Sequence, residues 1–114
     1  MNLTTELKGK TAVVSIIGDL DASTASEAAD YLRLTLEEGY PVVIIDLGQV
    51  PFMSSAGLRF LLDTHQQSKV AGSQIVLAAA QIGVERVLTT SGFTRILTSY
   101  PTVDEALKEN HKKD

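Results

Sequence analysis

The stretch VVIIDLGQVPFMSSAGLRFLL, residues 42–62, decides the fold of this chain. It opens with a continuous β-branched run at 42–45, which is typical of a central strand covered on both faces and is expected to end at Asp46. An amphipathic helix is predicted to begin near Ser55 and to stop at Gly72. A buried strand that leads through a loop into a helix is the repeating unit of an α/β protein.

The segments on either side of this stretch predict a mixed sheet. Two β-rich segments precede it, and the Lys-Gly-Lys turn between them predicts an antiparallel hairpin. Helical spacing between the later strands implies right-handed parallel crossovers. The predicted strands are 3–8, 11–17, 42–45, 73–79 and 94–98, and the predicted helices are about 23–39, 55–72, 82–90 and 102–110. The expected fold class is α/β: an N-terminal antiparallel hairpin, then βαβ crossovers, with helices packed against the sheet.

Composition narrows the class of protein. The 114 residues are expected to form one domain, 1–114, with a frayed tail at about 108–114. The absence of cysteine excludes disulfides and thiolate metal ligands, and a formal charge of −4 disfavours nucleic-acid binding. Because the chain shows no signal peptide and no apolar run of about 20 residues, we expect a cytoplasmic protein that does not bind membranes. No metal or cofactor motif and no catalytic combination is present, so a binding protein is expected rather than an enzyme.

Ser55 stands where the helix after the buried strand begins. The first backbone N–H groups of a helix have no partner within it, and the helix dipole places partial positive charge there. A phosphoryl group on this serine would add about −1.5 to −2 charge without melting the helix. The alternative is that a serine here does nothing except cap the helix.

Three short blocks resemble one family. The pattern IIDLGQVPFMSSAGL at 44–58 resembles the signature of the STAS domain, in particular of the bacterial anti-sigma-factor antagonists. The block GDLDASTA at 18–25 resembles that family's Gly-[Asp/Glu]-Leu-Asp turn after the second strand, and SGF at 91–93 resembles its short element after the third helix. The blocks follow the family's order and span nearly the whole chain.

The resemblance implies a partner-switching protein. In that family the unphosphorylated form binds an anti-sigma factor that is also a serine kinase, which frees a sigma factor; phosphorylation ends the binding and a serine phosphatase restores it. The modified serine follows the aspartate of Asp-Ser-[Ser/Thr/Ala]-Gly, and alignment on Gly57 places it at Ser55. Ser54 replaces the aspartate and is the alternative acceptor, and Arg59 stands where many members have a glycine. A monomer is expected, with a weak dimer as the alternative.

The predicted partner-binding residues surround this serine: Asp19, Asp21, Ser54, Ser55, Gly57, Arg59 and Phe60. Asp19 and Asp21 flank a leucine, so on an extended segment both would point toward a cation or a partner's arginine. The alternative is that Asp21 only caps the following helix. An apolar stripe at positions 58, 61, 62 and 65 leaves Phe60 exposed for docking, the alternative being that Phe60 packs under a neighbouring helix.

Two further functions fit the sequence less well. One is a STAS module that serves another signalling assembly or a transporter in trans. The other is a phosphoaspartate receiver with Asp46 as the acceptor, which the opening hairpin disfavours and in which the segment 99–101 lacks the expected lysine. His65 is expected to be half-buried rather than a metal ligand.

Overall fold

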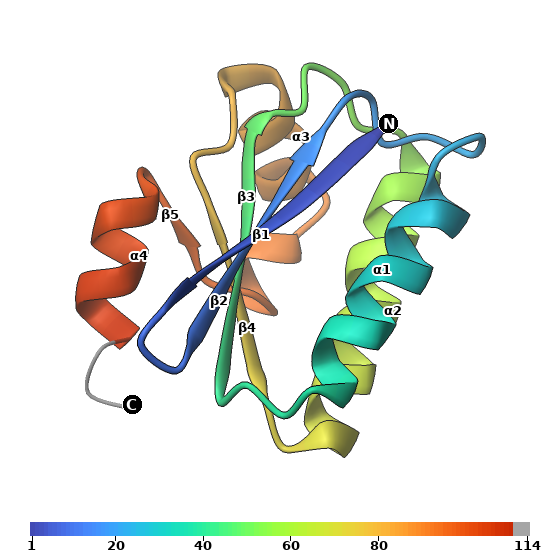
Figure 1. The fold of residues 1–114 in the computed structure, drawn as a ribbon. Helices are drawn as coiled ribbons and strands as arrows, with labels where there is room; N and C mark the ends of the chain where they lie inside the picture. Colours follow the sequence, from blue (N-terminus) through green and yellow to red (C-terminus); the bar gives the residue numbers. More distant parts are fainter. Residues whose placement is uncertain (111–114) are drawn as a thin grey trace.

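The computed structural model describes residues 1–110 and contains a single five-stranded sheet over that range (Figure 1). The strands are β1 (Asn2–Lys8), β2 (Thr11–Ile17), β3 (Val42–Gln49), β4 (Gln74–Ala78) and β5 (Ser99–Tyr100). The helices are α1 (Ala25–Glu37), α2 (Ser55–Ala71), α3 (Ile82–Thr90) and α4 (Val103–Asn110), with a 3-10 turn at Phe93–Arg95.

The sheet order follows the chain, β1-β2-β3-β4-β5. The pair β1–β2 is antiparallel and the other pairs are parallel, in a register that aligns Thr11 with Val42 and Val42 with Gln74. The predicted hairpin followed by parallel crossovers is therefore confirmed. Because the parallel strands run the same way, the loops after β2, β3 and β4 meet at one edge of the sheet, at the top of Figure 1.

Helices cover both faces of the sheet, which is why β3 is apolar along both of its sides. On one face α1, α2 and α3 pack over Val43 and Ile45. On the other face α4 packs over Val42 and Ile44, and Figure 1 shows it apart from α1 and α2. All four of these β3 side chains are fully buried.

Two predicted strand limits are wrong. Strand β3 continues past Asp46 to Gln49 because the carboxylate of Asp46 has partners there: Ser15 Oγ donates to it at 3.1 Å and the Gly48 N–H at 2.9 Å. The strand predicted at 94–98 is a 3-10 turn that leads to β5 at 99–100. Phe93 and Leu97 are both buried and the three residues between them are all exposed. In a strand Arg95 would share the buried face of Phe93 and Leu97, so this pattern fits a helical turn and not strand alternation.

The buried face of α2 also differs from the prediction. Its buried residues are Gly57, Phe60, Leu61, Thr64 and Ser68. Thr64 and Ser68 are tolerated in the interior because each donates its hydroxyl to a main-chain carbonyl one turn earlier, at 2.9 and 2.6 Å. The buried stripe is therefore displaced from the predicted one at positions 58, 61, 62 and 65, with only Leu61 fully buried in both.

His65 is half-buried, as expected. Burial lowers the pKa of its imidazole, and the charge of Lys69 lowers it further. Within residues 1–110 no group of three or more metal-ligating side chains is close enough to hold an ion.

The described part of the chain ends in helix α4. Helix α4 continues to a buried Asn110, so residues 108–110 of the predicted frayed tail are helical. The rest of that predicted tail, 111–114, lies outside the described residues. Among residues 1–110, no helix combines the length and the apolar character that a bilayer span requires.

Candidate functional site

The site is built where two loops at the carboxyl edge of the sheet join. Main-chain hydrogen bonds connect the turn after β2 to the loop before α2: the Leu20 N–H donates to Phe52 O at 2.9 Å and the Ser54 N–H to Leu20 O at 2.9 Å. Leu20 and Met53 form a one-rung parallel bridge, and both side chains are buried. The turn that carries Asp19 therefore lies beside the serine segment.

Gly57 allows α2 to approach this bridge. A Cβ at position 57 would lie 2.7 Å from Met53 Cγ, 2.9 Å from Leu20 O and 3.0 Å from Leu20 Cβ. Real Cβ atoms do not approach other heavy atoms that closely, so a residue with a side chain would push the helix away. Gly57 is buried, and the structure gives it a packing role rather than the direct partner contact that the sequence predicted.

The two serines have different surroundings. Ser54 is the N-cap of α2, and its Oγ accepts a hydrogen bond from the Ala56 N–H at 3.2 Å. Ser55 is the first helical residue and is exposed, and its hydroxyl forms no hydrogen bond with any residue in 1–110. The available hydroxyl is therefore that of Ser55.

The two aspartates do not act as the expected pair. The Asp21 carboxylate accepts from the hydroxyl of Ser23 at 2.7 Å and from its N–H at 2.9 Å. These hydrogen bonds lower the pKa of the Asp21 carboxyl, and the one from the Ser23 hydroxyl has the largest effect. Asp21 thus supports the turn before α1, as the alternative expected, although the N-cap residue of that helix is Thr24. Asp19 is exposed, and its carboxylate forms neither a hydrogen bond nor an ion pair with the described residues.

A shallow groove of about 460 Å³ extends from the start of α2. It is lined by Ser55, Ala56, Leu58, Arg59, Leu62 and Phe93. The third sequence block thus contributes Phe93 to the same surface as the serine. Arg59 is exposed and pairs with Asp63, whereas Phe60 is only 3% exposed and cannot be a docking residue. The prediction for Phe60 is wrong because the buried face of α2 includes position 60.

The sequence patterns did not predict two exposed apolar residues that the structure places at this edge. Phe52 is 54% exposed in the loop before α2, and Ile82 is 78% exposed at the start of α3. Gln81 Nε2 donates to Gly48 O at 3.1 Å, which holds the start of α3 beside the end of β3. An apolar residue at a helix start resembles a core position, and only the structure separates the two.

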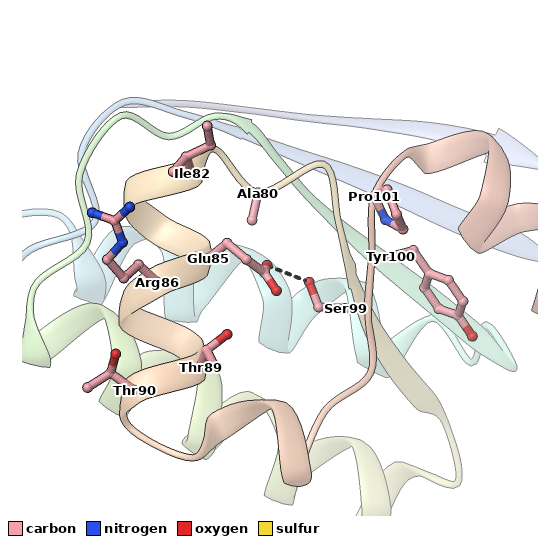
Figure 2. A pocket seen from close by; sticks show the side chains of 9 residues that line it. All are labelled: Ala80, Ile82, Glu85, Arg86, Thr89, Thr90, Ser99, Tyr100 and Pro101. Carbon is pink, nitrogen blue, oxygen red and sulfur yellow. Dashed lines mark hydrogen bonds between the residues drawn. The ribbon is translucent and has the colours of Figure 1, made fainter.

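A larger cavity lies between α3 and β5 and shares no residue with the groove at Ser55 (Figure 2). Its volume is about 580 Å³, and its lining residues are Ala80, Ile82, Glu85, Arg86, Thr89, Thr90, Ser99, Tyr100 and Pro101. Figure 2 shows the Glu85 carboxylate turned to Ser99, whose hydroxyl donates to it at 3.0 Å. This carboxylate is therefore engaged within the protein.

The chain belongs to the STAS domain family, whose model matches residues 2–106. A relative in Bordetella bronchiseptica, BtrV, is named an anti-sigma factor antagonist; it is 28% identical over 84% of this chain and 83% of its own length. A Mycobacterium tuberculosis relative, Rv2638, is named an anti-anti-sigma factor and is 34% identical over 57% of this chain and 44% of its own length.

Solved structures agree with the family match. An anti-sigma factor antagonist from Mycobacterium paratuberculosis has a TM-score of 0.88 at 26% identity, with 95% of this chain and 92% of that chain covered. The anti-sigma factor antagonist SpoIIAA in its unphosphorylated form has a TM-score of 0.80 at 18% identity, with 97% of each chain covered, and shows the shared fold. The fold class and family expected from the sequence are confirmed.

Proposed function

We propose that this protein is an anti-sigma-factor antagonist that binds its partner through the carboxyl-edge surface and is switched off by phosphorylation of Ser55. The observation that carries the proposal is the exposed Ser55 hydroxyl at the start of α2, which has no hydrogen-bond partner among residues 1–110 and lies beside a groove, on a segment that adjoins the turn of Asp19. The names of the Bordetella and mycobacterial relatives support the partner class.

The proposed partners are an anti-sigma factor with serine kinase activity and a serine phosphatase, all in the bacterial cytoplasm. The kinase transfers the γ-phosphoryl group of ATP to Ser55 Oγ, the hydroxyl proton passes to a base of the kinase, and ADP leaves. The phosphatase uses water to release inorganic phosphate and restores the hydroxyl. This chain is the substrate of both reactions and needs no catalytic group of its own.

Phosphate opposes binding for an electrostatic reason. A surface that buries a neutral hydroxyl against a partner would have to desolvate about −1.5 to −2 charge after phosphorylation. Asp19 adds negative charge on the neighbouring turn. Like charges without partners at an interface cost several kcal/mol, which is enough to change a complex from mostly bound to mostly free.

Phosphate mapping tests the acceptor. The protein is incubated with serine kinases of the same organism and ATP, and the phosphate is located by mass spectrometry. Ser55→Ala is expected to abolish labelling. Ser54→Ala is expected to keep it while losing about 1 kcal/mol of unfolding free energy, because the helix loses its cap. Labelling that persists in Ser55→Ala and disappears in Ser54→Ala would reverse the assignment.

Phe52 is expected to anchor the partner. Aromatic anchors that become buried at an interface cost about 2 kcal/mol or more when truncated, so Phe52→Ala should weaken binding about 30-fold. Val70→Ala is the matched control, since Val70 is 92% exposed on α2, about 22 Å along the helix from Ser55. Titration calorimetry with the purified partner measures both. Equal affinities of the two variants would remove Phe52 from the interface.

A further inference from the structure

Arg59 lies four residues after Ser55 on α2. Residues four apart on a helix are neighbours on its surface, and helical side chains lean toward the N-terminus. A side chain at position 59 can therefore extend back over the first turn. Both residues line the same shallow groove.

In the unmodified protein Arg59 contacts Asp63, with 3.7 Å between Nε and Oδ1. The two side chains are 78% and 51% exposed, and ion pairs of this kind contribute little. The order of charges is also the weaker one, since an acidic residue stabilises a helix more when it precedes the basic residue. Within residues 1–110 Arg59 has no second ion pair, so the guanidinium is held loosely.

Phosphorylation of Ser55 would give Arg59 a stronger partner than Asp63, on the N-terminal side of Arg59 in α2. The phosphate precedes Arg59 by four residues, which is the favourable order. It carries about −1.5 to −2 charge where Asp63 carries −1, and its three oxygens can accept two parallel N–H bonds from a guanidinium. Charge, order and hydrogen-bond geometry all favour the phosphate over Asp63.

We propose that Arg59 leaves Asp63 and closes over the phosphate when Ser55 is phosphorylated, an inference that rests on the proposed function. The partner then loses two contacts in one step, since the hydroxyl becomes an anion and the exposed guanidinium is withdrawn from the surface. The phosphorylated protein that is released from the partner thus differs from the bound form in the position of the Arg59 guanidinium as well as in its added negative charge.

The test places phosphoserine at position 55 of the full chain during translation and follows the phosphate by phosphorus NMR. A nearby cation stabilises the dianion, so the second pKa of the phosphate in the otherwise unchanged chain is expected to lie at least about 0.3 pH units below that in Arg59→Gln. The difference should vanish near 1 M salt, where the Debye length is about 3 Å. Asp19 and Asp21 are the same in both proteins and cancel in the comparison.

Two variants make the result specific. Arg33→Gln removes an exposed arginine of α1 that pairs with Glu37, and it is expected to leave the phosphate pKa unchanged. Asp63→Asn removes the competing carboxylate and should lower the phosphate pKa further. Equal pKa values in the parent and Arg59→Gln, or equal effects of Arg59→Gln and Arg33→Gln, would overturn the proposal. Because no kinase is needed, a failure of the proposed function would show separately in phosphate mapping.

Discussion

Ser55→Asp is expected to weaken binding to the anti-sigma factor by at least about 100-fold, equivalent to about 2.8 kcal/mol, without loss of stability. The substitution places a charge at an exposed position where the unmodified protein presents a hydroxyl without a hydrogen-bond partner among residues 1–110. An anion in the first turn of a helix is favourable by about 0.3–1 kcal/mol, so the folded state should be retained or slightly stabilised. Titration calorimetry gives the affinity, and urea denaturation gives the stability.

Two controls separate charge at this position from other effects. Ser55→Ala removes the hydroxyl without adding charge and is expected to keep the binding. Gln66→Glu adds one negative charge at an exposed site of the same helix, about 16 Å from Ser55, and should bind like the parent. A folded Ser55→Asp variant with the affinity of the parent would contradict the proposal that negative charge at position 55 ends partner binding.

Gly57→Ala is expected to lower the free energy of unfolding by about 1–3 kcal/mol, the usual cost of overpacking an interior. The added methyl would meet Met53 Cγ at 2.7 Å and Leu20 O at 2.9 Å, and neither the helix nor the bridge can move without loosening the other. The better helix propensity of alanine, worth about 1 kcal/mol, is not enough to offset this contact. Urea denaturation measures the change.

Gly83→Ala is the matched control, because it makes the same substitution inside a helix with open space around it. Apart from the adjacent residues and the backbone of the same helix, no heavy atom of residues 1–110 lies within 4 Å of a Cβ built at Gly83. The same change should therefore raise stability by about 0.5–1 kcal/mol through helix propensity alone. Equal gains at positions 57 and 83 would show that the contact with Leu20 and Met53 is not tight.

The sequence predicts the fold well where one residue pattern has one structural solution. The β-branched run at 42–45 could only be a central strand, and Gly72 ends α2 in a left-handed conformation with φ of 76°. The pattern fails where polar groups find partners that the sequence does not reveal. Asp46 stays in β3 because Ser15 and Gly48 donate to its carboxylate, and these partners are known only from the folded chain.

The candidate site was predictable in its location and less so in its details. Motif blocks from two distant segments indicated that Asp19 and Ser55 belong together, and the one-rung bridge confirms that their loops adjoin. Phe60 was misplaced because a shift of one position around a helix, about 100°, exchanges buried and exposed faces. The role of Gly57 also required coordinates, since a close approach depends on what lies opposite.

The bridge between the two loops has an evolutionary consequence. Two hydrogen bonds between main-chain atoms join the turn after β2 to the loop after β3, so the connection does not depend on which side chains these loops carry. Exposed positions such as Asp19 and Phe52 can thus diverge while the backbone frame stays fixed. Such a frame would let related copies in one cell acquire different partners, and it offers a physical route by which parallel signalling circuits avoid crosstalk.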